Sequence, residues 1–411
     1  MKKFLFSLLA LSAFIVSSCS SDDNGPGDPD PVDPTGEEIT VSGILTENET
    51  WEAKNIYILD GKVVVGDGVT LTIEAGTIIK GAEGQETLAS ALVVDQGGKL
   101  MAEGTAEKPI IFTSVLDDIE QGQTQGSNLT TTSTGLWGGV IVLGKAPISV
   151  EGDLGTAHIE GIPADESYGQ YGGADVADNS GVITYISIRH GGVTIGEDNE
   201  INGLTLGGVG NGTVIENIEV VANQDDGIEW FGGSVNVTNA LVWAAGDDAF
   251  DADQAWSGIL SNGIVIMTAE SGTGLELDGP EGSAASENGF TMENITLIGN
   301  GSTSLIADLR DGLIANLDNV LAHGFSAASS VKIAGADSAA ELAADRIAFT
   351  NWEIVLAEGA SKESTFSGDY TPGDEVKFLD NLVNPANVEA ATVGADSTVF
   401  GWTFAASGEA F

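Results

Sequence analysis

Acidic residues recur at regular intervals in the middle of this chain. The pairs Asp225-Asp226 and Asp247-Asp248 each stand eight and nine residues after an asparagine, Asn217 or Asn239. Carboxylate oxygens without histidine or cysteine nearby favour calcium, which binds six to eight oxygen ligands, over zinc or copper. The candidate calcium ligands are therefore Asp225, Asp226, Glu229, Asp247, Asp248, Asp251, Asp253, Glu276 and Asp278.

The elements that must position these acids form a sequence repeat. Asn217, Asn239 and Asn262 lie 22 and 23 residues apart, and a fixed period of this length indicates a solenoid. Equivalent residues of successive solenoid coils stack about 4.8 Å apart, which is the spacing of hydrogen-bonded strands. We therefore expect each asparagine to donate a hydrogen bond to its copy in the next coil, and each acid to lie beside another acid.

Strand alternation predicts which side chains point outward. If Ile228 and its equivalents point into the coil, Glu229, Asp251 and Glu276 point out of it. The spacing between Asp251 and Glu276 is 25 residues rather than 22, so their register is the weakest step of this prediction. A second outward column would contain Asp253 and Asp278, and Asp308 is expected to extend it.

Stacked carboxylates need compensation. Two unpaired charges about 5 Å apart cost roughly 1–3 kcal/mol, and no lysine or arginine lies between Arg189 and Arg310. A bound calcium ion would cancel the repulsion. The alternative is a solvated acidic face on which the carboxyl pKa values are raised. Arg310 is expected to form an ordinary ion pair with its neighbours Asp308 and Asp311.

Short apolar runs punctuated by glycine fill the rest of the chain from residue 39 onward. Runs of three to five residues, as in "TLTIEAG" and "KPIIFTS", predict strands and leave no room for helices. Three short strands per turn would give a triangular coil. We predict an all-β solenoid over residues 39–358, with polar insertions at 115–134 and 161–181, and a C-terminal cap or appendage at 359–411.

The first residues have the features of a bacterial lipoprotein signal. Lys2 and Lys3 precede a short apolar run that ends in small residues before Cys19, so residues 1–18 are expected to be cleaved and Cys19 to carry the lipid, including palmitate. Residues 19–38 are rich in Ser, Asp, Pro and Gly and are expected to form a disordered tether. The protein would then be anchored to the outer membrane through its lipid.

Net charge narrows the possible partners. The chain has a formal charge of −48 at pH 7 and a single cysteine in 411 residues. Such a charge excludes nucleic acid as a partner, and one cysteine excludes a disulfide within the chain.

The solenoid pattern, with passages such as "DDGIEWFGGSVNVTNALVWAAGDDAFDADQAW", resembles the right-handed parallel β-helix of the pectate-lyase-like superfamily, and within it a group of Bacteroidetes surface lipoproteins. The start of the tether, "CSSDDN", is similar to the acidic export signal of that group, which implies display on the cell exterior. The superfamily implies two enzymatic precedents. Lyases use calcium bound to aspartate with an arginine or lysine base, for which Arg189 and His190 of "SIRHGG" are suggestive, and hydrolases use several aspartates.

Aromatic residues near the acids suggest a ligand. Trp256, Tyr168 and Tyr171 could stack on sugar rings, whereas Trp230 and Trp243 are expected to face the core. The leading hypothesis is a surface lipoprotein whose calcium-occupied face binds an extracellular glycan without turning it over, with an outer-membrane transporter as a possible partner. The alternatives are a lyase or hydrolase acting on acidic polysaccharide, and an adhesin or structural surface protein.

Overall fold

The computed structural model describes residues 36–196, 199–280, 283 and 289–411. The predicted signal at residues 1–18, the predicted lipidation site Cys19 and residues 20–35 of the predicted tether lie outside the described residues. The tether was predicted to reach residue 38, but strand β1 (Glu38–Leu45) already begins there and pairs with β3 (Ile56–Val65). The coil therefore starts at the last residue assigned to the tether.

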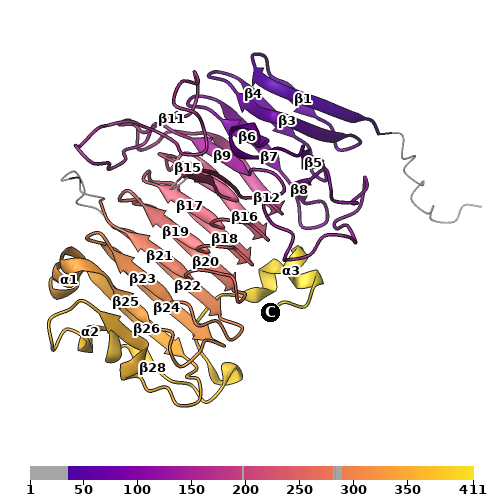
Figure 1. Ribbon diagram of the computed structural model, residues 1–411. Coiled ribbons are helices and arrows are strands. Elements are labelled where there is room, and N and C mark those ends of the chain that lie inside the picture. The colour runs from indigo at the N-terminus through magenta and orange to yellow at the C-terminus, as the bar shows by residue number, and fades with distance from the viewer. Residues whose placement is uncertain (1–35, 197–198, 281–282, 284–288) are drawn as a thin grey trace, which may run out of the picture. The chain divides into compact units, whose positions relative to one another are not determined.

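Parallel strands wind into a β-helix in which most strands pair with the strand two further along the chain (Figure 1). One sheet, here called the short-strand sheet, contains β9 (Val140–Leu143), β15 (Leu204–Gly207), β17 (Ile228–Phe231), β19 (Phe250–Asp253), β21 (Leu275–Asp278), β23 (Ala307–Arg310), β25 (Val331–Ile333) and β27 (Phe366–Gly368). The predicted all-β solenoid is confirmed.

The other strands of these coils form the long-strand sheet. It contains β12 (Gly181–Arg189), β16 (Val214–Val221), β18 (Val237–Trp243), β20 (Ile259–Ile266), β22 (Phe290–Ile298), β24 (Ala315–His323), β26 (Ile347–Ile354) and β28 (Leu382–Val383). The N-terminal coils are built from β1, β3, β2 (Glu49–Trp51), β4 (Thr70–Ile73), β5 (Ile78–Gly81), β6 (Ala91–Val94), β7 (Lys99–Glu103) and β8 (Ile110–Ser114).

Each long strand supplies two of the three sides of a coil. The two halves of β12 pair separately with β7 and β8, so one long strand corresponds to two short ones. The bend lies at an asparagine in the left-handed region, with φ of 57° at Asn217, 59° at Asn239 and 68° at Asn262. Asparagine tolerates this conformation better than most residues. The predicted three strand segments per coil are therefore present.

The bend asparagines form a ladder, as predicted. The Asn239 Nδ2 donates to Asn217 Oδ1 at 2.9 Å, and Asn262 Nδ2 donates to Asn239 Oδ1 at 2.7 Å. A second run of the ladder continues from Asn294 through Asn319 to Asn351, with distances of 3.2 and 3.1 Å. Stacking thus satisfies side-chain amides at a partly buried corner.

Apolar side chains of both sheets fill the interior of the coil. Trp230, Trp256 and Phe250 are all 0 % exposed, and the two tryptophan rings stack with centroids 4.8 Å apart. No helix among the described residues is long and apolar enough to cross a membrane.

The prediction that the coil contains no helix is wrong: a single 3-10 turn, η1 (Glu86–Leu88), follows β5, and an α-helix follows β25. Helix α1 (Gly335–Ala343) connects β25 to β26 and packs against β23 and β26. Its sequence, "GADSAAELA", is rich in alanine, the residue with the highest helix propensity. This segment lacks the short apolar runs that predict strands elsewhere in the chain. Its high helix propensity therefore decides its conformation.

The C-terminal segment both caps the coil and returns along its side. Strands β27 and β28 extend the sheets beyond the predicted boundary at residue 358, and helix α2 (Val376–Leu379) packs against β26. Residues 384–411, here called the C-terminal strap, then run back so that helix α3 (Phe404–Ser407) contacts β16 (Figure 1). The strap is an outer cover of the long-strand sheet.

Candidate acidic cation site

Acidic side chains line the outer face of the short-strand sheet. Ile228, Phe250 and Leu275 are 0 % exposed in the core, so their neighbours point out of the coil. Glu229 lies opposite Asp251, and Asp251 lies opposite Glu276. The predicted register is confirmed, including the longer interval of 25 residues. Two of the extra residues lie in the loop between β20 and β21, and the third lies before Leu260 of β20.

The position of Asp308 differs from the prediction. Asp308 lies opposite Glu276, so it extends the column of Glu229 rather than that of Asp253. Arg310 lies opposite Asp278. Strand β23 begins two residues later than it would if Asp308 followed Asp278 in the second column. Asp308 therefore takes the first outward position of β23, and Arg310 takes the second.

The paired turn acids stack between successive coils as predicted. Asp226 and Asp248 are only 7 % and 5 % exposed. An Asp226 Oδ1 accepts a hydrogen bond from the Asp248 backbone N–H at 2.8 Å, and Asp248 Oδ1 accepts one from the Thr273 N–H. These bonds hold each carboxylate beside the next turn.

Three overlapping groups of carboxylates have oxygen atoms within 4.8 Å of one another. The first group contains acids of the turns that precede β17 and β19. The second combines turn acids with an acid of β19, and the third lies on β17 and β19. Asp226 and Asp251 each belong to two of these groups, which comprise Asp225, Asp226 and Asp247; Asp226, Asp248 and Asp251; and Glu229, Asp251 and Asp253. The predicted ligands Glu276 and Asp278 lie outside these groups. Spacing of this kind suits shared coordination of a cation.

Burial and mutual repulsion disfavour the charged form of these groups. Desolvation, followed by neighbouring carboxylates, raises the pKa of Asp226, Glu229 and Asp251 well above the usual range. The same causes raise the pKa of Asp225 to about 8. Among the described residues no lysine or arginine nitrogen lies within 4.0 Å of these four carboxylates.

Several buried oxygen atoms at the site accept no hydrogen bond from the described residues. They are Asp251 Oδ1, Asn202 Oδ1 and Asn223 Oδ1. An unsatisfied buried oxygen costs about 1–3 kcal/mol. A hard cation is a ligand that such oxygens could share.

Sequence reasoning missed three residues that the fold brings to Glu229. Asn202 is 0 % exposed, and its Nδ2 donates to Glu229 Oε2 and, at 3.4 Å, to Glu160 Oε1. The Glu200 backbone N–H donates to Glu160 Oε2 at 3.5 Å. Burial raises the pKa of Glu160 to about 7. No repeat links these residues to the acid columns, so the sequence held no signal that would have found them.

Cations compensate the acids at the other end of the column. Arg310 contacts Glu276 at 2.5 Å and Asp278 at 2.7 Å, and Lys332 contacts Asp308 at 2.9 Å. The predicted pairing of Arg310 with Asp308 is therefore wrong, and Asp311 lies at 3.8 Å. Arg310 and Lys332 lie directly opposite Asp278 and Asp308 on adjacent strands, so each reaches across the sheet instead of along the chain.

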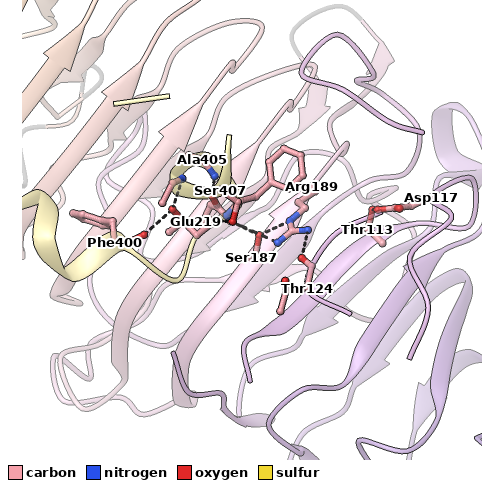
Figure 2. A network of polar contacts seen from close by, with 12 residues as sticks. Thr113, Asp117, Thr124, Ser187, Arg189, Glu219, Phe400, Ala405 and Ser407 are labelled. Atoms are coloured by element: carbon pink, nitrogen blue, oxygen red, sulfur yellow. Dashed lines mark hydrogen bonds and ion pairs between the residues drawn. The ribbon is translucent and has the colours of Figure 1, made fainter. Parts of the chain in front are cut away.

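Arg189 and His190 do not reach the acidic face. Arg189 is 2 % exposed on the long-strand sheet, where its Nε donates to Ser187 Oγ at 2.7 Å and its Nη2 lies 3.9 Å from Glu219 (Figure 2). His190 is also buried, and its Nδ1 lies 2.8 Å from the Ser133 carbonyl oxygen. Neither side chain is available as a base at the acids.

The predicted aromatic platform is wrong for two of its residues. Trp256 is 0 % exposed and donates from Nε1 to the Val235 carbonyl at 3.0 Å, so it is a core residue. Tyr171 is 2 % exposed and its hydroxyl lies 3.0 Å from Gln254 Oε1. Tyr168 is half-buried and packs against the apolar cluster that contains Tyr171 and Phe231.

The burial of Tyr168 and Tyr171 has a single cause. Strands β10 (Ala157–His158) and β11 (Gln170–Tyr171) lie in an insertion that packs on Phe231, an outward residue of β17. Hairpin β13–β14 (Val193–Gly196 and Asn199–Ile201) contributes to the same cluster. Trp230 faces the core as predicted, whereas Trp243 does not, because it packs outside the coil against Phe404 of the strap.

Comparison with known proteins identifies the family. The model of the pectate-lyase-like β-helix domain matches residues 43–405. Searches of curated proteins and of solved structures found no match. The match covers most of the chain and agrees with the parallel strand pairing described above, so the chain belongs to the pectate-lyase-like β-helix family.

Proposed function

We propose that the acidic face binds calcium and, through it, an extracellular glycan, in a protein anchored to the outer membrane at Cys19. The observation that carries the proposal is the group of Asp226, Asp248 and Asp251. Their oxygens lie within 4.8 Å of one another, all three side chains are buried, and Asp251 Oδ1 accepts no hydrogen bond from the described residues. A carbohydrate-related role also fits the family.

The donor set suits calcium in particular. It consists of carboxylate and amide oxygens, with Asn223 and Asn202 beside the acids, and calcium accepts such ligands in flexible geometry. Magnesium demands a stricter octahedron and gives up water reluctantly, so it would fit a stacked series of carboxylates less well. Calcium would also remove the repulsion that raises the carboxyl pKa values.

Calorimetric titration with calcium at about pH 7.5 tests the metal. The unsubstituted protein is expected to release or absorb heat, and its melting temperature is expected to rise. Asp226→Asn and Asp251→Asn should each lose most of the binding. Glu216→Gln, which changes an exposed acid of β16 on the other sheet, is the matched control. Absence of both heat and thermal shift in the unsubstituted protein would contradict the calcium proposal.

Retention on a glycan array with and without calcium tests the ligand. The proposal expects binding that disappears when a chelator is added, since the glycan would be held through the cation. Binding that persists in chelator would place the glycan elsewhere, and no retention at all would count against the glycan.

The lipid anchor is tested separately. Labelling cells with a palmitate analogue should modify the unsubstituted protein and not Cys19→Ala, and protease added to intact cells should degrade the former. A Cys19→Ala variant that still fractionates with the outer membrane would contradict the anchor.

Glu160 and Glu229 support hydrolysis of an acidic polysaccharide as a second candidate. Both carboxyl groups are hydrogen-bonded to one Asn202 amide, and the Glu160 pKa of about 7 suits a general acid. A reducing-sugar assay with Glu160→Gln as the control tests this candidate. Equal product formation by both proteins would remove Glu160 from any such reaction.

A further inference from the structure

A groove of about 410 Å³ lies between the asparagine ladder and the C-terminal strap, on the corner of the coil formed by the bends of the long strands. Its coil side is formed by Thr238, Asn239, Ser261, Asn262 and Asn294, and its other side includes Asp396 of the strap. The acids of the candidate cation site lie on the short-strand sheet and in the turns that precede its strands, and they do not line this groove.

The ladder is interrupted at this groove. Asn262 and Asn294 occupy equivalent bends, because Ser261 lies opposite Glu293 and Gly263 opposite Ile295. Asn262 Oδ1 nevertheless accepts the Asp396 backbone N–H at 2.6 Å, and its Nδ2 donates to Asn239 and, at 3.4 Å, to the Asp396 carbonyl. The strap therefore takes the place of the next rung. Asn294 Nδ2 is left without a hydrogen bond to the described residues while Asn294 lines the groove.

The groove is preformed because the strap is firmly attached. Glu219 accepts the backbone N–H groups of Phe404 and Ala405 at 3.1 and 2.9 Å, and Arg189 lies 4.8 Å from the centre of the Phe404 ring. Figure 2 shows this network, with Glu219 between the strap and Ser187. Charge-assisted hydrogen bonds of this kind are among the stronger polar contacts.

The chemistry of the lining restricts the ligand. The side chains of the coil side are amides and hydroxyls, which donate and accept hydrogen bonds and carry no charge. An anion would find no cation among the lining residues and would be repelled by a chain of charge −48. An apolar ligand would find few partners, since Val399 is the one large apolar residue of the lining.

We propose that this groove binds a neutral polyhydroxylated ligand, such as an uncharged sugar, through the amide and hydroxyl side chains, including the Asn294 Nδ2 that donates to none of the described residues. The volume of about 410 Å³ is within the range of small-ligand sites. No aromatic side chain lines the groove, so the ligand gains hydrogen bonds without stacking. The dissociation constant is accordingly expected in the millimolar range, roughly 4 kcal/mol of binding free energy.

Saturation-transfer NMR with the full chain tests the proposal. The probes are the neutral disaccharides maltose, cellobiose, lactose and trehalose, with sorbitol as a linear polyol, each at about ten times the highest expected dissociation constant. All measurements contain chelator, so the result is independent of the proposed calcium site. Transfer to at least one probe is expected, and no transfer to any of them overturns the proposal.

A matched pair of substitutions locates the binding. Thr238 and Thr350 each precede a ladder asparagine, but only Thr238 lines the groove and Thr350 is exposed elsewhere. Thr238→Phe should fill the groove and reduce the transfer at least fivefold, whereas Thr350→Phe should leave it unchanged. Equal transfer by the two variants overturns the assignment to this groove.

A measurement on the unsubstituted protein covers the case in which Thr238→Phe does not fold. Titration with the sugar that binds should shift the side-chain amide resonances of Asn294 and Asn239. The resonances of Asn217 and Asn351, which belong to the same ladder outside the groove, should stay in place. Shifts confined to other residues would overturn the proposal.

Discussion

The two ends of one acidic column differ in a single respect. Glu229 and Asp251 occupy the same outward position of the short-strand sheet as Glu276 and Asp308. At the downstream end, Arg310 and Lys332 contact the acids. At the upstream end, no described lysine or arginine does so. A purely structural column would be expected to have cations along its whole length, so the uncompensated end is the part that calls for a ligand.

Glu276 marks the boundary between the two ends. Burial and the Asp248 carboxylate raise its pKa to about 9, and Arg310 acts against this rise from 2.5 Å away. One carboxylate thus experiences both environments. Three changes test whether the two ends differ in charge compensation: a change of pH, the removal of a cation, and the neutralisation of one acid at each end.

A change of pH should have the largest effect. The folded-state pKa values of Asp225, about 8, and Glu160, about 7, exceed those of an unfolded carboxyl near 4. The native state therefore holds protons that the unfolded state has lost, and in chelator the free energy of unfolding should fall from about pH 4 to about pH 9. One pKa unit is about 1.4 kcal/mol, so we expect a loss of several kcal/mol.

Urea denaturation at about pH 5, 7 and 9 measures this loss. Saturating calcium should remove most of the slope above about pH 6, because the cation stabilises the ionised acids. A stability that does not change with pH in chelator would show that the upstream acids are not mutually repelled.

Removing the downstream cation should have the next largest effect. Arg310→Gln leaves the buried Asp278 and the partly buried Glu276 without their cation. Since Arg310 itself is 39 % exposed and partly screened by solvent, the free energy of unfolding at about pH 7 should fall by roughly 1–3 kcal/mol. Arg346→Gln, which breaks a pair with Glu341 from a half-exposed arginine, is the control and should cost less than about 1 kcal/mol. Equal losses in the two variants would contradict the compensation described here.

The same substitution at the two ends should have opposite signs. In chelator, Asp251→Asn removes a carboxyl group whose charged form is disfavoured by burial and by neighbouring carboxylates, and it should raise the free energy of unfolding by about 1–2 kcal/mol. Asp278→Asn removes a partner of Arg310 and should lower it by a similar amount. Thermal unfolding of both variants measures the difference, and a common sign would mean that the two ends are equivalent.

The smallest effect is expected at the edge of the column. Lys332 is 40 % exposed and Asp308 11 % exposed in their ion pair. Because Lys332 pairs with one carboxylate, whereas Arg310 pairs with two, and because solvent screens this pair, Lys332→Gln should cost only about 0.5–1 kcal/mol. Unfolding in about 1 M salt should shrink the difference further. A cost as large as that of Arg310→Gln would show that the number of paired carboxylates does not decide the loss of stability.

Several features could be read from the sequence because they are periodic. The asparagine spacing predicted the solenoid and the ladder, and strand alternation predicted that Glu229, Asp251 and Glu276 share one face. The predicted position of Asp308 was wrong, since the length of the loop before β23 does not indicate where the strand begins. Trp256 was predicted to be exposed because polar residues precede it in the sequence. Polar neighbours along the chain do not prevent its ring from packing on Trp230 inside the coil.

The sequence alone determined the repeat, the parallel stacking and the acidity of one wall, because residues one coil apart must become neighbours when a periodic chain winds. Only the tertiary structure decided what joins that wall from outside the repeat. Asn202 and Glu160 reach Glu229 through an insertion and a hairpin, and the strap reaches Asn262 and Glu219 across intervals of 134 and 185 residues. These contacts depend on surfaces that exist only after the coil has formed, and no local pattern encodes them.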